Sequence, residues 1–528
     1  MTESAPEASV ESKADSPTVP AAPPAPPAPP APPVNDRNAR KPTDLLIVRI
    51  FLLTLGVLLA GYAFLGRGFA HLGIGPIYVG EMVLALGLVA TAVAAVRSRL
   101  QISRSWLVIV LIAFMLLGLA RTVPFISTYH INALRDATLW GYAVFALMVF
   151  ALLDREFVLR IFRAYGYMAI IFLFWAPIAY FIFVNSTTET APGSGVFASN
   201  IIPNAPGSNV PLLFFKSQDV AVQTAGAIAV LVLLAAPHIR RALDFLWRFV
   251  AALPAAWIVY TTGTVTRGGL AAVALSVGVV GALAGRTRNW LPLISGGILF
   301  AAILASGLSL PATEVAQASA TPVVLPSVLP SSHVAPPPTP IPAPTPTPVP
   351  DWTTPRAQTT TQWWENVVSI FAGSSDPRLS GTKAFRLAWW NDIIGYTFNG
   401  PYFWTGKGFG INLADSDGFQ VSKDDSLREP HNTHMSVLAR MGVPGFSLWA
   451  VLQLGFALFL LRALLAYRRV GDKQFVVIAA WVLAFWTAMM VNTTFDPYLE
   501  GPQGGIWFWV LFGLGLVVIR LAPRRQAE

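Results

Sequence analysis

The chain has 528 residues, of which 54% are hydrophobic and only 12% are charged, and it contains 17 Trp and no Cys. This composition excludes an ordinary soluble globule and predicts an all-α polytopic membrane protein. The net charge of +9 comes mainly from short basic loops between apolar stretches, so it gives no reason to expect nucleic acid as a partner.

The N-terminal stretch, residues 1–44, is rich in Pro and Ala and opens with several acidic residues. Such a segment cannot bury a core, so we predict a disordered cytoplasmic tail. Basic residues then lie at the start of the first membrane span, which we expect to remain uncleaved.

Hydropathy predicts about twelve membrane-spanning helices, nine in residues 45–310 and three in residues 443–521. The expected ranges are 45–65, 76–96, 105–120, 138–153, 165–184, 218–237, 249–263, 268–284, 289–310, 443–461, 474–492 and 504–521. One large loop, residues 311–442, separates the ninth helix from the tenth, and residues 522–528 form a short tail.

Basic residues follow every second predicted span. They are Arg97, Arg99, Arg104, Arg155, Arg160, Arg163, Arg240, Arg241, Arg248, Arg286, Arg288, Arg462, Arg468, Arg469, Lys473, Arg524 and Arg525. Because positively charged loops stay in the cytoplasm, both termini are expected inside and the large loop outside.

Several outward loops carry basic residues that are costly at membrane depth unless they are paired or functional. Arg135 either pairs with its neighbour Asp136 or faces a ligand. Lys216 either extends to the interface or binds an anion. Arg267, in a tight turn of hydroxyl residues and glycines, either anchors the interface or binds phosphate, for which its planar guanidinium is suited. The first outward loop, Gly66 to Gly75, has no Asp or Glu.

The large loop begins with a Pro/Thr-rich spacer, residues 311–351, for which we predict an extended tether. The helical remainder, residues 352–442, begins with a short helix near Trp363 to Phe371, expected at the membrane surface. A helix over about 382–398 places Phe385, Trp389 and Ile393 on one apolar stripe, with Arg386 near its edge.

A glycine-rich turn containing Gly408 and Gly410 follows. It lacks the Lys-Ser/Thr ending of a P-loop, so it is either a plain turn or a place where backbone amides approach an anion. Asp415 and Asp417 are expected in an exposed turn.

His431 is the candidate general base. It precedes a helix that Asn432 or Thr433 can cap and that Gly442 and Pro444 can end. At a helix N-terminus the macrodipole disfavours imidazolium, which keeps the ring able to accept a proton. His431 and His434 have a spacing that could also hold a metal, with Glu429 as the only further ligand nearby. We expect no metal and no cofactor.

The chain resembles the O-antigen ligase and O-antigen polymerase superfamily of bacterial membrane glycan transferases. The matching motifs are Arg386-Leu-Ala-Trp-Trp, Gly406-Lys-Gly-Phe-Gly410, Pro430-His431-Asn432, Leu438-Ala-Arg440-Met-Gly-Val-Pro-Gly445, Thr266-Arg267-Gly-Gly and Leu134-Arg135-Asp136. The spacer, and Thr where Ser often precedes Arg267, depart from the usual pattern.

The resemblance implies transfer of a glycan from undecaprenyl diphosphate to a hydroxyl of a glycan, lipid or protein acceptor, outside the inner membrane and with inversion. His431 would be the base. Arg267, Arg386, Arg135, Lys216 and Arg440 would bind the pyrophosphate, and Asn432, His434, Gly408 and Gly410 would shape the site. Ligase and polymerase remain equal alternatives.

Two other classes stay open. A flippase or exporter of lipid-linked glycans would also use outward basic residues, but it should show internal repeats and charged or broken helices at the membrane midplane. A scaffolding membrane protein would explain the hydrophobicity but not the outward His and Arg.

Overall fold

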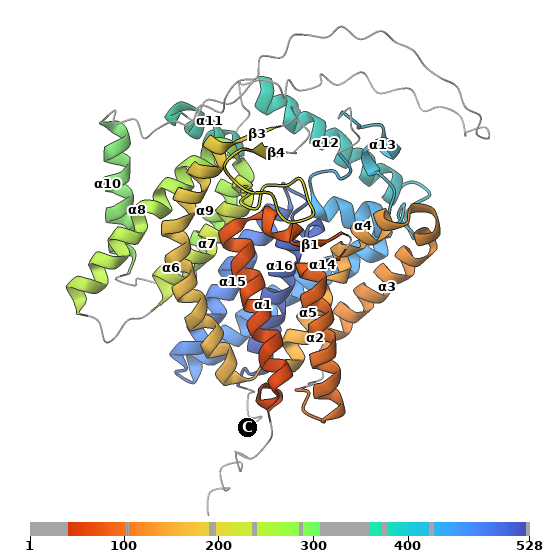
Figure 1. The fold of residues 1–528 in the computed structure, drawn as a ribbon, viewed down its shortest axis with the longest axis horizontal. Coiled ribbons are helices and arrows are strands. Elements are labelled where there is room, and N and C mark those ends of the chain that lie inside the picture. Colours follow the sequence, from red (N-terminus) through yellow and green to blue (C-terminus); the bar gives the residue numbers. More distant parts are fainter. Residues whose placement is uncertain are drawn as a thin grey trace, which may run out of the picture. The chain divides into compact units, whose positions relative to one another are not determined.

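The computed structural model describes residues 41–75, 77–101, 103, 105–189, 197–234, 240–284, 289–306, 359–371, 377–421 and 427–523. Within these ranges the chain is mostly helical (Figure 1). The first helices are α1 (Leu46–Leu65), α2 (Val79–Val96), α3 (Trp106–Tyr129), α4 (Ile131–Gly141), α5 (Ala143–Leu152), α6 (Arg155–Ser186), α7 (Ser217–Leu233) and α8 (Arg241–Val265). The others are α9 (Arg267–Ala284), α10 (Trp290–Ala305), α11 (Thr360–Phe371), α12 (Pro377–Phe398), α13 (Leu413–Asp417), α14 (Thr433–Arg469), α15 (Lys473–Thr493) and α16 (Pro502–Arg520).

Eight of the described helices are long and apolar enough to cross a membrane: α1, α2, α3, α6, α8, α14, α15 and α16. The pair α4 and α5, bent by 41°, passes the same test together, and α7, α9 and α10 are shorter apolar helices. Each of the twelve ranges expected from hydropathy overlaps one of these helices or the bent pair. A multi-pass membrane protein is thus confirmed, whereas the count of twelve stays a prediction.

Helix α16 is the most enclosed of the candidate spans, with 83% of its apolar window buried. It lies among α5, α14 and α15 in the middle of the helices (Figure 1). Its aromatic residues pack against α14, where Phe512 stacks on Phe456 with ring centroids 4.1 Å apart. Aromatic packing of this kind fixes where α14, and therefore the segment before it, enters the bundle.

Two short antiparallel hairpins correct the expectation of a purely α-helical chain. One pairs β1 (Gly73–Ile74) with β2 (Ile77–Tyr78), and the other pairs β3 (Thr187–Glu189) with β4 (Phe197–Ser199). Strands of two or three residues are too short to show an alternating pattern in a sequence. Three short 3₁₀ helices, Pro42–Asp44, Arg67–His71 and Tyr498–Glu500, complete the elements described.

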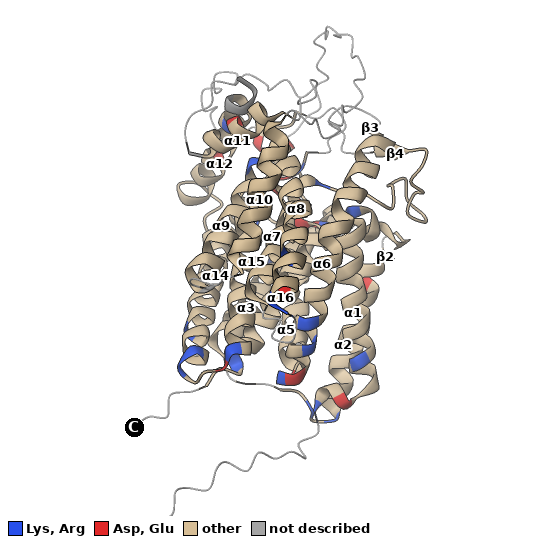
Figure 2. Ribbon diagram, turned by 90° about the vertical axis from the view of Figure 1, so that its left-hand side faces the viewer, with Lys and Arg blue, Asp and Glu red and all other residues tan. Residues whose placement is uncertain are grey.

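Lys and Arg gather at the end of the helices that lies away from α11 and α12 (Figure 2). Arg97 and Arg99 follow the end of α2, Arg155 begins α6, and Arg468 and Arg469 end α14. This segregation supports the predicted topology, in which α11 and α12 face outward.

Both helices expected in the outer loop are present as α11 and α12. Phe385, Trp389 and Ile393 form the buried stripe of α12, as predicted. The side chain of Asn366 on α11 donates to the carbonyl oxygens of Gly263 at 2.9 Å and Thr264 at 2.8 Å, which holds α11 against the end of α8. The Pro/Thr spacer and residues 1–40 lie outside the described residues.

Candidate functional site

The segment before α14 is shaped by the cap of that helix. The side-chain oxygen of Asn432 accepts hydrogen bonds from the backbone amides of His434 and Met435, at 2.9 and 3.2 Å. Asn432 is therefore the N-cap that the sequence predicts. The predicted break is also present, because Gly442 has φ 67° and divides α14 into two helical parts.

His431 lies immediately before this cap with a left-handed backbone, φ 51°. Such a φ is uncommon for a residue other than glycine and requires support from its surroundings. Part of that support comes from α12, because the indole of Trp390 donates to the carbonyl oxygen of Pro430 at 2.8 Å. The helix that carries Arg386 thus also fixes the backbone next to His431.

The His431 imidazole is held neutral. Its Nδ1 atom is buried and has no hydrogen-bond partner among the residues that the structure describes. Burial, and then the nearby Arg386 guanidinium, lower the pKa of the imidazole to about 3, although Asp496 acts in the opposite sense. A histidine in this state can accept a proton at neutral pH.

Arg386 and the backbone next to Arg267 both contact Phe495, in the loop that follows α15. One guanidinium nitrogen of Arg386 donates to the carbonyl oxygen of Phe495 at 3.1 Å. Arg267 begins α9, and its neighbour Gly268 packs so closely on Phe495 that an added Cβ would lie 2.7 Å from the Phe495 Cβ. Two segments far apart in the sequence therefore bring an arginine each to one loop.

Lys216 belongs to an ionic group that the sequence analysis did not foresee. Its ammonium pairs with the buried carboxylate of Asp496. Arg67 bridges Asp496 at 3.5 Å and Asp219 at 2.9 Å. Burial alone would raise the pKa of Asp496, but Lys216 and Arg67 outweigh it and lower that pKa. Lys216 therefore does not extend to the interface as a lone cation.

His434 points into the helices and both of its ring nitrogens are engaged. The Trp449 indole donates to Nδ1 at 3.0 Å, and Nε2 lies 3.3 Å from the hydroxyls of Thr493 and Thr494. Since Nδ1 accepts, the proton is on Nε2. This arrangement joins α14 to the end of α15 and leaves no nitrogen for a metal shared with His431.

The glycine-rich turn is a plain turn whose amides bind protein groups. The amides of Lys407 and Gly408 donate to the carbonyl oxygens of Ala439 and Arg440, at 2.7 and 3.1 Å. Gly408 and Gly410 have φ 88° and 97°, and a Cβ at Gly410 would come within 2.4 Å of Tyr129. The turn therefore ends the first part of α14 and packs on α3.

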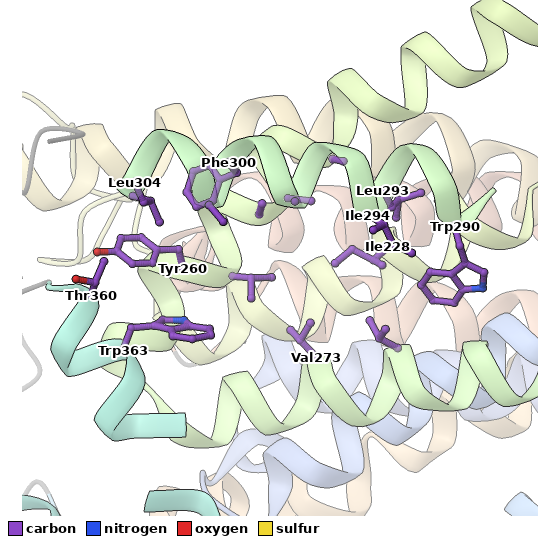
Figure 3. Close-up of a pocket in the computed structure, with 17 residues that line it drawn as sticks. Ile228, Tyr260, Val273, Trp290, Leu293, Ile294, Phe300, Leu304, Thr360 and Trp363 are labelled. Atoms are coloured by element: carbon purple, nitrogen blue, oxygen red, sulfur yellow. The ribbon is translucent and has the colours of Figure 1, made fainter. Parts of the chain in front are cut away.

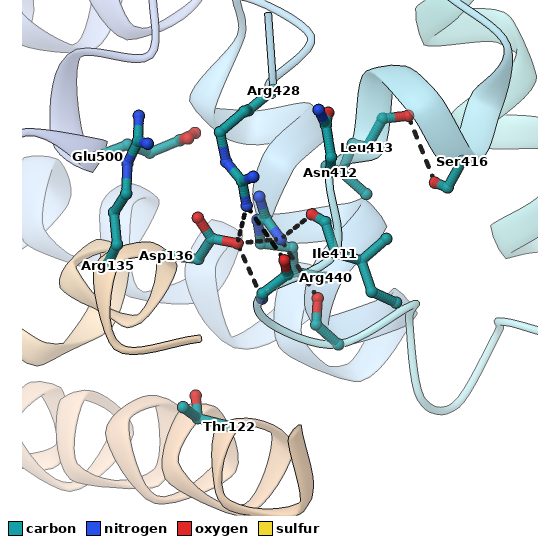
Figure 4. A network of polar contacts seen from close by, with 12 residues as sticks. Thr122, Arg135, Asp136, Ile411, Asn412, Leu413, Ser416, Arg428, Arg440 and Glu500 are labelled. Carbon is teal, nitrogen blue, oxygen red and sulfur yellow. Dashed lines mark hydrogen bonds and ion pairs between the residues drawn. The ribbon is translucent and has the colours of Figure 1, made fainter. Parts of the chain in front are cut away.

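Asp136 joins this turn to α4 (Figure 4). Its carboxylate accepts from the Gly410 amide at 2.8 Å and pairs with Arg440 at 2.9 Å and Arg428 at 3.4 Å. The alternative in which Asp136 pairs with Arg135 is therefore wrong. The ion-pair partners of its carboxylate are Arg428 and Arg440, which are distant in the sequence. Arg440 is buried in this group, and Arg135 is exposed.

Asp417 corrects the expectation of an exposed acidic turn. Its side chain is buried, pairs with Lys407, and accepts from the Trp389 indole at 2.7 Å. Asp415 is exposed, as expected. Among the described residues, no group of three His, Asp or Glu side chains is arranged to hold a metal.

An apolar pocket of about 460 Å³ lies between α8, α9 and α10 (Figure 3). Trp290 lies at one end and Trp363 and Thr360 of α11 at the other. The Trp363 indole packs against Gly263, near the turn that carries Arg267. Its lining suits an apolar chain and not a sugar or a diphosphate.

Residues 249–450 match a family model described as O-antigen ligase. The matched region runs from α8 into α14 and includes Arg267, Arg386 and His431. Residues 249–450 are therefore similar to an O-antigen ligase domain. No curated protein matches the chain.

This domain match confirms the resemblance to the O-antigen ligase superfamily, and that family implies an enzyme of the ligase or glycosyltransferase type. It also implies a lipid-linked glycan donor and an acceptor in a membrane. Asp496 and Arg67 are candidate site residues that could not be identified from the sequence motifs. A signal was present, because an acid or a base at the mouth of an apolar helix is costly unless it is paired.

Proposed function

We propose that the protein transfers a glycan from undecaprenyl diphosphate to an acceptor hydroxyl at the outer face of the inner membrane. The observation that carries this proposal is a neutral histidine, His431, beside the guanidinium of Arg386. The family match supplies the reaction class, and the arrangement of charges supplies the roles.

In the proposed step, His431 removes the proton of the acceptor hydroxyl as its oxygen attacks the anomeric carbon. The new bond forms on the face opposite the diphosphate, so the bond to the diphosphate oxygen breaks with inversion. Negative charge grows on the leaving diphosphate, and Arg386 and Arg267 stabilise it through charge-assisted hydrogen bonds. Lys216 and Arg67 contribute less, because Asp496 and Asp219 partly neutralise them.

A transferase and a flippase are separated by one reaction. Purified full-length protein in a bilayer disc is incubated with lipid-linked glycan and candidate acceptors, and free undecaprenyl diphosphate is measured. The transferase releases it, while a flippase or a scaffold does not. We expect release to continue in EDTA, and restoration of an EDTA-inactivated enzyme by magnesium or manganese would overturn the arginine roles.

A further inference from the structure

The carboxyl groups of Glu429 and Glu500 and the hydroxyl of Ser436 lie near the proposed base, His431. The charged residues around these groups differ from those around His431. Glu429 is two residues before His431, and Glu500 is four residues after Asp496. The two segments run side by side, with the Thr433 hydroxyl 3.4 Å from the Asp496 carbonyl oxygen. His431 is influenced by Arg386, Lys216 and Arg67. The charges that act on Glu429 are instead Arg440, Arg135, Asp136 and Arg428.

This second group, Glu429, Ser436 and Glu500, contains buried polar atoms. The Ser436 hydroxyl is fully buried and lies close enough to the Glu500 carboxyl to act on its pKa through a hydrogen bond. The buried Oε1 atom of Glu500 has no well-formed hydrogen bond among the described residues. Because buried polar groups in folded proteins are nearly always bonded, this Oε1 atom points to a polar ligand or water.

The carboxyl and hydroxyl groups of this second group suit the hydroxyls of a sugar. Burial, and then repulsion by Glu429, raise the pKa of Glu500, and burial also raises the pKa of Glu429. The nearby Arg440 and Arg428 are already bound to Asp136. Two carboxyl groups and a hydroxyl together offer several hydrogen-bond acceptors and a donor, which matches the hydroxyls of a sugar.

We propose that Glu429, Ser436 and Glu500 form the subsite that binds the hydroxyl groups of an acceptor sugar beside His431. The proposal rests on the proposed transferase function, whose diphosphate would lie among the arginines. Arg135 lies at the edge of the group and belongs to the acceptor side.

The test separates sugar binding from turnover. Glu429→Gln and Glu500→Gln keep the shape of each side chain and remove the carboxyl, and Glu365→Gln, at an exposed position of α11, is the matched control. Binding of a panel of tritium-labelled neutral disaccharides to the full-length protein is measured without donor. The acceptor KM and the release of undecaprenyl diphosphate to water are measured with donor.

We expect both site variants to weaken disaccharide binding and to raise the acceptor KM by at least about tenfold, because a site built for hydroxyls loses its partners. Glu365→Gln should leave disaccharide binding, the acceptor KM and release to water unchanged, because this exposed side chain lies outside the proposed subsite. Glu429→Asp should recover part of the binding. Disaccharide binding that is absent, or equal in the wild type and both variants, overturns the subsite. Binding that the variants weaken in a protein that never releases undecaprenyl diphosphate keeps the subsite and overturns the transferase.

Discussion

The His431 imidazole should work as a base far below the pH at which a free histidine becomes charged. Its pKa is lowered to about 3 by burial and by Arg386, so the neutral, proton-accepting form persists as the pH falls. We therefore expect kcat/KM for transfer to stay level between about pH 7.5 and about pH 5, since this parameter reports groups of the free enzyme. A fall centred near the ordinary histidine pKa would contradict the assignment.

Replacing His431 by Ala tests the same residue directly. Loss of a positioned base should lower turnover by roughly 10²- to 10⁴-fold while binding of the lipid-linked donor persists. Donor binding is measured separately on the same preparation. Near-full turnover in the variant would exclude His431 as the base.

The arginines next to Phe495 should not tolerate lysine. Arg386→Lys and Arg267→Lys keep the charge but replace a planar fork by a single ammonium, which cannot reproduce two parallel bonds to phosphate. We expect each to lose on the order of 10²-fold in turnover, as when one preorganised charge stabiliser is removed. Arg160→Lys, at an exposed position near the start of α6, is the control and should leave turnover unchanged.

Candidate site residues that belong to sequence motifs could be predicted, but the residues with which site residues form ion pairs could not. His431, Arg386 and Asn432 occur in recognisable runs, and the cap formed by Asn432 follows from local rules. Lys216 and Asp496 pair across 280 positions of the chain. No periodicity or motif links residues so far apart, so the ionic group around Asp496 became visible only in the folded chain.

At the scale of elements, the carboxylate of Asp136 connects α4 to the glycine-rich turn and to α14. Asp136→Asn should destabilise the protein by about 3–5 kcal/mol, because it leaves the buried Arg440 without a charge partner. A lower thermal midpoint of the detergent-solubilised protein is the expected result. Asp415→Asn, in an exposed turn close by, is the matched control, and equal midpoints for the two variants would show that the ion pairs contribute little.

Apolar helices were easier to predict than the segments between them. Length and hydropathy are enough to predict α1 or α15, because a run of about twenty apolar residues is typical of a membrane-spanning helix. Helix α3 runs to Tyr129, beyond the expected end near residue 120, because its last turns pack on the glycine-rich turn at Gly408 and Gly410. Such a packing partner lies in a distant segment, and hydropathy alone cannot supply it.

At the scale of the whole molecule, the proposed reaction requires the segment before α14 to face outward. Positively charged helix ends are retained in the cytoplasm, and α14 ends with Arg468 and Arg469. We expect topology reporters fused near Arg240 and Arg468 to be cytoplasmic, and reporters fused near Ser331 and Ser426 to be exported. Reporters with complementary activity, such as a periplasmic phosphatase and a cytoplasmic fluorescent protein, should be used at each position.

The pair at Ser426 and Arg468 is the decisive one, because these positions flank the single helix that begins next to His431. Opposite locations for the two would mean that α14 crosses the membrane with His431 at its outer end, where a lipid-linked glycan and its acceptor can meet. If both fusions report the same side, α14 does not span the membrane. If Ser426 reports the cytoplasm, His431, Arg386 and Glu429 all face inward, and both the transfer at the outer face and the acceptor subsite at that face are wrong.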